Sequence, residues 1–201
     1  MLRLIPLWVI GCSLWLVLTG CKEQALPVRS MDISCVEVGD ILFRRGDSMA
    51  SRGVLRVDQD GFYSHVGLAV LVDGRIMVAH AVPDEDAQEF TKLDSLEDFY
   101  APSRAGSGAI CRLPLDETHR QLLNTRALQL VAAKLPFDHD YDDANHDKLY
   151  CTEFVWLVYQ VLALDLSCGQ RKAVDFYFVS GNLILPSHLF KYPSLQLIDS
   201  F

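Results

Sequence analysis

Positive charge is scarce in this sequence, which has 18 Lys and Arg residues against 26 Asp and Glu residues and a formal net charge of −8. Nucleic-acid binding needs a basic face, so nucleic acid is excluded as a partner, and an electrostatic attraction to anionic membranes is disfavoured. No CxxC pair occurs among the six cysteines, so a zinc ribbon has no support. We find no internal repeat and no second domain. The 201 residues, half of them hydrophobic, therefore predict one domain with a sizeable core.

The N-terminus has the features of an export signal. Arg3 supplies a short positive region, residues 4–18 are apolar, and Leu18-Thr19-Gly20-Cys21 resembles the bacterial lipobox. The resemblance implies a signal peptide over residues 1–20 and a lipid on Cys21, which would attach the protein to a membrane. An uncleaved single-span anchor is the alternative.

The same resemblance bears on localisation. Lys22, rather than Asp, follows the lipidated cysteine, which implies sorting to the outer membrane of a bacterial cell envelope, facing the periplasm. Residues 21–37 are then a lipidated tether, and residues 38–201 form the folded domain.

Four cysteines remain in the mature chain once Cys12 is removed with the signal and Cys21 carries lipid. Disulfides persist outside the cytoplasm, so a pair among three of them is possible, and buried free thiols are equally compatible with the sequence. These three are Cys35, Cys111 and Cys168. The fourth is Cys151.

A β-hairpin is the clearest local signal. Residues 63–72 and 75–83 are apolar runs joined by Asp73-Gly74, which is typical of a two-residue turn, and both faces are apolar, which predicts cover on both sides. If Val72 pairs with Arg75, the residue numbers of each facing pair on the two strands sum to 147. Residues 65 and 80 then lie on one face as diagonal neighbours, with Gly67 opposite residue 80. Both are histidines, so the register predicts that two imidazoles meet, and a slip of one residue would separate them.

A second signal is the apolar run of residues 149–164, which predicts a helix buried on all sides. Its polar residues, Cys151, Thr152 and Glu153, fall in the first turn. There the free N–H groups and the helix dipole favour a thiolate, as a cysteine nucleophile requires. A small buried apolar cysteine is the alternative interpretation.

The remaining patterns predict a mixed, α+β domain. We expect strands over residues 41–43 and 108–113, and helices over 48–57, 93–100 and 116–135. The last of these is amphipathic, with Leu122, Leu123, Ala127, Leu130 and Val131 on one face. Downstream of Leu164 no motif is interpretable beyond aromatic packing.

Hydrolysis by a thiol needs a nucleophile, a base, an orienting group and oxyanion donors. Cys151 can supply the nucleophile and its own N–H an oxyanion donor, while His65 can supply the base and His80 the orienting group. Four ordered motifs in the chain resemble the circularly permuted NlpC-type papain-like hydrolases of the YaeF/YiiX group, over roughly residues 38–164. They are Gly39-Asp40-Ile41-Leu42-Phe43, Ser64-His65-Val66-Gly67, Pro136-Phe137-Asp138 and Tyr150-Cys151-Thr152-Glu153-Phe154.

The resemblance implies a permuted papain-like fold, in which an antiparallel sheet or small barrel packs on the nucleophile helix. It also implies a cysteine amidase or peptidase, with Cys151 as nucleophile and His65 as base, acting first on peptidoglycan stem peptides and second on N-acyl or lipid substrates. His80 stands where most of the group has Glu, which resembles the lecithin–retinol acyltransferase branch. Asp40, Tyr63 and Tyr150 are candidates for substrate binding, with strand and core packing as the alternative. We interpret Glu153 as structural.

Metal chemistry is the main rival hypothesis. A calcium loop starting at Asp138 is disfavoured, because its sixth position would be Asp143 instead of Gly and its twelfth Leu149 instead of Glu. Zinc held by His65, His80 and Cys151 is a sharper alternative. We predict no metal and no cofactor. A binding module without enzymatic activity is the third hypothesis, and the oligomeric state is not determined by the sequence.

Overall fold

The structure is a computed structural model of the whole chain that describes residues 31–83, 90–176 and 179–201. The expected signal peptide, Cys21 and most of the tether lie outside these ranges. Within them, no helix combines the length and the apolar character needed to cross a membrane.

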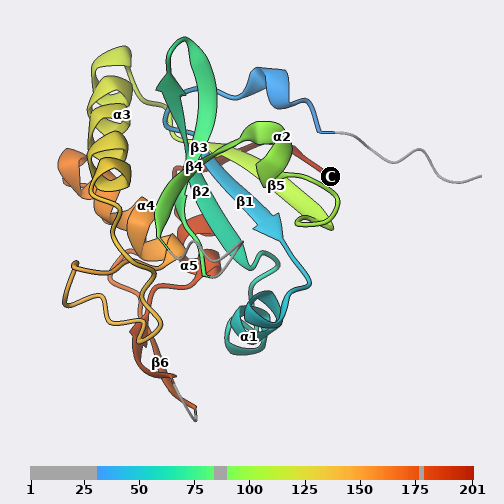
Figure 1. Cartoon of the computed structure of the whole chain (residues 1–201), viewed down its shortest axis with the longest axis vertical. Coiled ribbons are helices and arrows are strands. Elements are labelled where there is room, and N and C mark those ends of the chain that lie inside the picture. The colour runs from blue at the N-terminus through green and yellow to red at the C-terminus, as the bar shows by residue number, and fades with distance from the viewer. Residues whose placement is uncertain (1–30, 84–89, 177–178) are drawn as a thin grey trace, which may run out of the picture.

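A six-stranded antiparallel sheet organises the domain, in the order β4-β3-β2-β1-β5-β8 (Figure 1). Its strands are β1 (Ile41–Arg45), β2 (His65–Val72), β3 (Arg75–Ala81), β4 (Thr91–Ser95), β5 (Ser107–Arg112) and β8 (Gln196–Ser200). A separate hairpin consists of β6 (Lys172–Phe176) and β7 (Val179–Leu183). The predicted α+β class and antiparallel sheet are confirmed.

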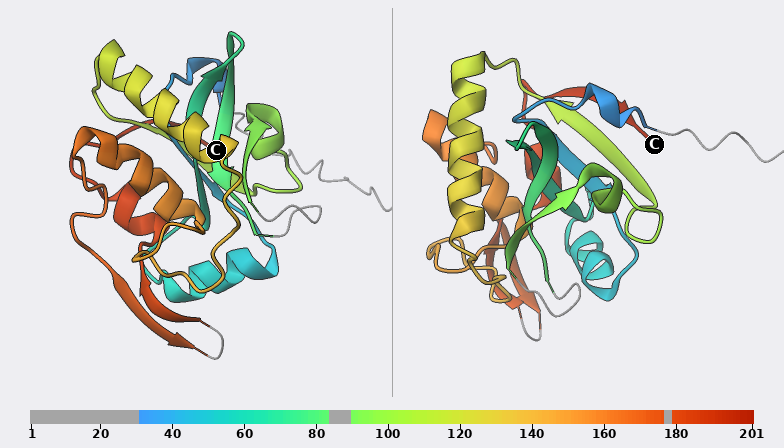
Figure 2. Two further views of the ribbon diagram at one scale, coloured as in Figure 1. Left: turned by 60° about the vertical axis from the view of Figure 1, so that its left-hand side comes forward. Right: turned by 45° about the horizontal axis from the view of Figure 1, so that its top comes forward.

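Five α-helices accompany the sheet in the described part of the chain. They are α1 (Met49–Val57), α2 (Leu96–Phe99), α3 (Glu117–Ala132), α4 (Cys151–Tyr159) and α5 (Pro186–Phe190). Short 3₁₀ turns cover Ile33–Cys35 and Gln160–Leu162. Helices α3, α4 and α5 lie on one face of the sheet, and α2 lies on the other (Figure 2).

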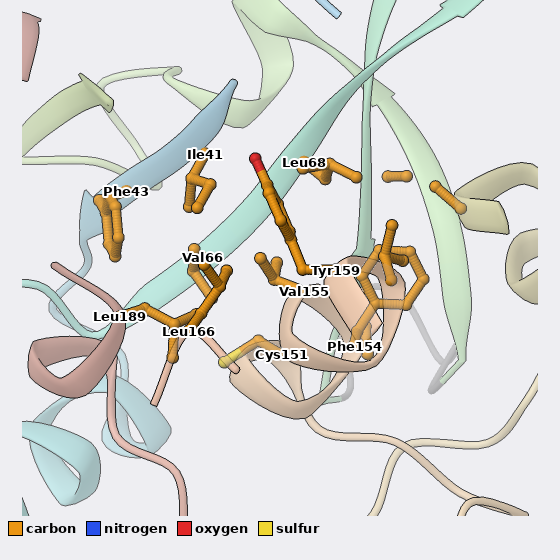
Figure 3. Packing of buried hydrophobic residues seen from close by; sticks show 14 of the residues in the cluster. Ile41, Phe43, Val66, Leu68, Cys151, Phe154, Val155, Tyr159, Leu166 and Leu189 are labelled. Atoms are coloured by element: carbon orange, nitrogen blue, oxygen red, sulfur yellow. The ribbon is translucent and has the colours of Figure 1, made fainter. Parts of the chain in front are cut away.

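Both faces of the β2–β3 hairpin are buried, as predicted. Alternate residues such as Val66 and Leu68 join the core beneath α3 and α4 (Figure 3), whereas Ala69 and Val78 join a smaller core with Phe99 of α2. The second core also receives the end of the expected tether, Met31–Val36. The domain therefore has two cores, one on each side of the sheet.

The turn chemistry fixed the register of this hairpin. Val72 pairs with Arg75 and Leu68 with Ala79, which is the predicted sum of 147. Asp73 and Gly74 both have positive φ, 48° and 77°, as the two central positions of the turn require.

Several boundaries differ from the sequence predictions. The expected helix over 93–100 is wrong in its first part, because Thr91–Ser95 pairs with β3 and Ser95 then caps α2 by accepting the N–H of Asp98. In α3, Leu122 is 43% exposed, whereas Leu123 is buried. The buried helix α4 ends at Tyr159 and not near 164, because Gln160–Leu162 tightens into a 3₁₀ turn and Ala163 adopts a left-handed conformation.

Residues after Leu164 contribute more structure than aromatic packing. Strand β8 adds to the sheet beside β5, and α5 packs on the α4 side of the core through Leu189. All four described cysteines are free thiols, so the disulfide alternative is not realised.

Gly67 has a packing role that the register alone did not show. A Cβ at this position would lie 2.5 Å from Val78 Cγ1 and 3.2 Å from Phe99 Cε2. Val78 is stiff about χ1, and Phe99 is fully buried, so neither can easily move. The absence of a side chain at residue 67 therefore lets Phe99 pack close to the hairpin and to both histidine rings.

We predict that Gly67→Ala lowers the free energy of unfolding by about 1–3 kcal/mol through overpacking, measured by urea denaturation. Gly53→Ala is the matched control, because a Cβ there meets nothing within 4 Å and Gly53 lies inside α1. It should stabilise the protein by up to about 1 kcal/mol. Equal effects of the two substitutions would contradict this account of Gly67.

Candidate active site

The two histidines of the hairpin meet as the register predicts. His65 Nε2 lies 2.8 Å from His80 Nδ1, and both side chains are buried. Phe99 packs against both rings, with centroid distances of 5.8 Å to His65 and 5.4 Å to His80. The imidazoles are therefore a fixed pair on the α2 side of the sheet.

Asp94 on β4 extends this pair and was missed by the sequence analysis. Its Oδ2 lies 3.1 Å from His80 Nε2, while Lys92 Nζ is 3.2 Å from its Oδ1 and Arg104 Nη1 is 3.1 Å from its Oδ2. The signal that could have found it is Ser95, three residues before Asp98. This spacing is typical of a helix N-cap and leaves residues 91–95 free to form a strand.

The ionisation of Asp94 determines which ring nitrogen carries the proton in His80 and in His65. Burial opposes the charge of this carboxyl, but the hydrogen bond from His80 and the charge of Lys92 hold its pKa well below the usual range. Asp94 therefore accepts from His80 Nε2–H, and the Nδ1 of a neutral His80 accepts in turn from His65 Nε2–H. This order leaves His65 Nδ1 with a lone pair.

Both imidazoles are kept neutral. Burial lowers the pKa of His65 well below its ordinary value, and the charges of Arg44 and Lys92 lower it further. Burial also lowers the pKa of His80, although its hydrogen bond to Asp94 acts in the opposite direction. A neutral His65 with a free Nδ1 lone pair is suited to accept a proton.

Cys151 approaches from the opposite face of the sheet, at the first position of α4 (Figure 3). Beyond the pairing of Leu68 with Ala79, the backbone N–H groups of Val66 and Thr152 lower the pKa of the Cys151 thiol and so lie beside its sulfur. Arg44 lowers the pKa of both the thiol and His65, so one guanidinium acts on both groups. The sulfur thus meets the strand one residue after His65.

The thiolate that the sequence predicts for Cys151 at rest is wrong, because this side chain is buried. Cys151 is 9% exposed, and burial raises the pKa of its thiol to about 11, despite the N–H donors of Val66 and Thr152 and the charge of Arg44. The sulfur therefore carries its proton at neutral pH and needs a base to become a nucleophile.

The three residues considered for substrate binding have structural partners. Asp40 is fully buried at the far end of β1, where Arg112 Nε lies 2.7 Å from its Oδ1. Tyr63 packs in the core between Phe43 and Phe190. Tyr150 caps the start of α4, and its hydroxyl accepts the N–H of Ile184 at 3.0 Å. Of the three, only Tyr150 adjoins Cys151.

Glu153 is structural, as expected, but its charge state is not the one that a helix dipole favours. Its side chain is fully buried, with Oε2 3.3 Å from the N–H of Tyr150 and Oε1 2.8 Å from His146 Nδ1. Burial raises the pKa of Glu153 to about 9, and the carboxylates of the neighbouring acidic loop add to this effect. The carboxyl group is therefore protonated at neutral pH.

The acidic loop is closed by its own hydrogen bonds. Asp138 is buried and accepts the N–H groups of Asp140 and Asp142, while Asp143 pairs with Arg171. Among the residues that the structure describes, no three His, Cys, Asp or Glu side chains are arranged to hold a metal ion. The set of His65, His80 and Cys151 thus does not form the three-ligand zinc site of the rival hypothesis.

We predict that Asp94→Asn lowers kcat on the order of 10²-fold with little change in KM. The amide disturbs the tautomer that leaves His65 Nδ1 free, and the loss is smaller than the ~10⁴ found for a carboxylate that orients a catalytic base directly. Steady-state kinetics on a cleaved amide measure it. Asp98→Asn, on exposed α2, is the matched control and should retain wild-type kcat. A change confined to KM would exclude an orienting role for Asp94.

We predict that Glu153→Gln removes a pH dependence of stability. The folded pKa of about 9 exceeds the ordinary carboxyl pKa of 4.5, so folding takes up a proton, and the stabilisation present below pH 4.5 is lost as the pH rises towards 9. Relative to wild type, the Gln variant should gain up to about 1.4 kcal/mol in free energy of unfolding per pH unit across this window. Urea denaturation from pH 5 to 9 measures it. Parallel curves for the two proteins would refute it, and exposed Glu97→Gln should give such parallel curves.

Comparisons with known proteins identify the family of this chain. Residues 35–198 match the family model described as permuted papain-like amidase enzyme, YaeF/YiiX, C92 family. The protein YiiX of Escherichia coli (strain K12) is 27% identical over 148 residues, which cover 72% of this chain and 67% of YiiX.

A solved structure shows the same fold. It is titled as metalloprotein yiiX from Escherichia coli O157:H7 and superposes with a TM-score of 0.68 at 21% identity, covering 82% of this chain and 97% of that one. The family match spans most of the chain and includes the cysteine-bearing helix and the histidine-bearing hairpin. The chain therefore belongs to the YaeF/YiiX family of permuted papain-like cysteine amidases.

Proposed function

We propose that the protein is a lipid-anchored thiol hydrolase of the bacterial cell envelope that cleaves an amide bond through Cys151, His65 and His80. The family supports a cysteine hydrolase. The anchor rests on the lipobox-like Leu18-Thr19-Gly20-Cys21. The amide is a peptidoglycan stem peptide or an N-acyl compound.

One observation carries the assignment of roles. The hydrogen-bonded chain from Asp94 through His80 leaves the Nδ1 of His65 as an acceptor, and the backbone N–H of the next residue, Val66, lowers the pKa of Cys151. The ring of His65 lies on the α2 side of the sheet and Cys151 lies on the other side, so the base and the protonated nucleophile adjoin the same end of β2 from opposite faces. This shared position supports pairing them in the reaction.

The chemistry follows from these protonation states. As Cys151 Sγ attacks the carbonyl carbon, His65 Nδ1 accepts the thiol proton, and the N–H of Cys151 stabilises the oxyanion. The imidazolium then gives this proton to the departing amine, leaving a thioester on Cys151. Water, activated by the same nitrogen, hydrolyses the thioester and restores the thiol.

His80 and Asp94 act in this scheme without contacting the substrate. His80 orients the ring of His65 and accepts its Nε2–H, and the carboxylate of Asp94 fixes the tautomer of His80 and stabilises the charge that develops on the pair. The scheme uses no metal, whereas the solved relative is described as a metalloprotein.

We predict that Cys151→Ala lowers kcat on the order of 10⁴-fold or more and abolishes acyl-enzyme formation. Intact-mass spectrometry after mixing with peptidoglycan fragments, N-acyl amides and activated amides detects the thioester. Cys168→Ala is the matched control, because Cys168 is an exposed free thiol, and it should retain both activity and the adduct.

His65→Ala should leave the alkylation of Cys168 by iodoacetamide unchanged while removing the substrate-derived adduct on Cys151. Turnover by the Cys151→Ala protein would refute the nucleophile assignment. Loss of wild-type activity in chelator would favour the metal hypothesis instead.

A further inference from the structure

An apolar groove of about 860 Å³ lies between α1 and the β6–β7 hairpin. This volume is within the range of small-molecule sites in proteins. One wall is a face of α1 that includes Ala50, Val54 and Val57, and the other includes Ala173, Val174 and Leu183. Figure 2 shows α1 and the hairpin beside each other at one end of the domain. The catalytic scheme above does not use this groove.

One end of the groove adjoins the nucleophile. Leu185 lines it, and the preceding residue, Ile184, accepts a hydrogen bond from Thr152 Oγ1 at 2.5 Å. Tyr141 also lines it and packs on Tyr150 with a centroid distance of 5.4 Å. The residues on both sides of Cys151 in sequence thus touch elements of the groove.

The other end is open to solvent. Met49, the first residue of α1, is 89% exposed although it is a large hydrophobic residue. The opposite end of α1 is held by Asp58, whose Oδ2 accepts the N–H of Ser187 at 2.9 Å. The nine residues of α1 make a wall about 13 Å long from the α5 end to the exposed end.

The charges along the groove have one sign. Arg52, Arg56 and Lys172 line it, and the described lining residues include no carboxylate, in a chain with 26 acidic and 18 basic residues. Arg56 lies in the last turn of α1, and Lys172 pairs with Leu183, so two of the three cations lie towards the nucleophile end. An anionic group near the scissile bond and an apolar chain beyond it would match this distribution.

We propose that the groove binds the acyl chain of an anionic N-acyl amide, such as an N-acylated amino acid, with the chain along α1 and the carboxylate towards Arg56 and Lys172. This inference rests on the proposed amide hydrolysis and selects between its two substrate classes. A stem peptide would bring several amide groups that need hydrogen-bonding partners, and nine of the fourteen lining residues are apolar or glycine and offer no side-chain partner. An acyl chain needs only apolar contact.

The first test measures binding without catalysis. Full-length Cys151→Ala protein in membranes is irradiated with N-palmitoylglycine that carries a diazirine near the end of its chain, and the labelled peptides are mapped by mass spectrometry. Labels should fall within Met49–Val57 or Lys172–Leu185 and be displaced by excess N-palmitoylglycine, but not by N-acetylglycine. Labels elsewhere only, or displacement only by anionic phospholipid vesicles, would overturn the proposal.

Variants then separate the two parts of the groove. Ala50→Asp places a carboxylate among the apolar side chains at an exposed helical position and should reduce labelling at least tenfold, whereas Val161→Asp, on another exposed apolar surface, should not. Arg56→Gln with Lys172→Gln should weaken labelling by N-palmitoylglycine but not by neutral N-palmitoylglycinamide. Arg75→Gln, at the exposed hairpin tip, is the matched control. Equal labelling of all variants would exclude the groove.

The second test uses wild-type turnover of N-acylglycines of increasing chain length. The value of kcat/KM should rise by up to about fourfold per methylene while the chain fills the groove, and Ala50→Asp should flatten this rise, whereas Val161→Asp should not. Hydrolysis that does not depend on chain length would overturn the groove proposal and leave the thiol hydrolase intact. Labelling of the groove in a protein that cleaves no amide at Cys151 would overturn the thiol hydrolase and leave the groove proposal intact.

Discussion

Burial of polar groups at the open end of the β2–β3 hairpin is the constraint on which the site depends. Two imidazoles and a thiol lie there with almost no access to water, so that a charge on any of them would cost desolvation free energy. A single carboxylate, Asp94, keeps its charge because His80 hydrogen-bonds to it and the Lys92 ammonium lies beside it. That fixed charge orders the protons from His80 to His65, and a proton acceptor results without a charged histidine.

The same constraint decides the state of Cys151. A helix N-terminus stabilises an anion by about 0.3–1 kcal/mol at exposed sites and by up to about 2 kcal/mol in partly buried ones. Burial raises the pKa of this thiol from 9.0 to about 11 even after its N–H donors act, a net cost of roughly 3 kcal/mol for the thiolate. Burial therefore outweighs the helix dipole. The resting pair resembles the neutral hydroxyl and imidazole of a serine hydrolase more than a thiolate–imidazolium pair.

Sequence reasoning succeeded where the determining interactions are local. The Asp73-Gly74 turn sets the hairpin register, and the register alone brings His65 and His80 together. Sequence reasoning failed where the interacting residue is distant in the chain or where burial competes with a local preference. Asp94 faces His80 only because β4 pairs with β3, and β8 completes the sheet from residues without a recognisable pattern. The protonated state of Glu153 depends on a closed acidic loop around a buried helix start, which spacing does not reveal.

The groove illustrates the same limit for substrate recognition. Its walls come from α1 and from a hairpin more than a hundred residues later, so neither segment alone indicates a ligand. As a helix, Met49–Val57 is simply amphipathic, and its exposed Met49 has no evident purpose on an isolated surface. Once the β6–β7 hairpin faces it, the apolar side becomes a wall and the arginines become its edge. Asp58 ties α1 to α5, and Ile184, which precedes the groove residue Leu185, accepts a hydrogen bond from Thr152 beside Cys151, so this wall is connected to the start of α4. An acyl chain bound there would have its carbonyl delivered to Cys151 by the same core that buries the sulfur.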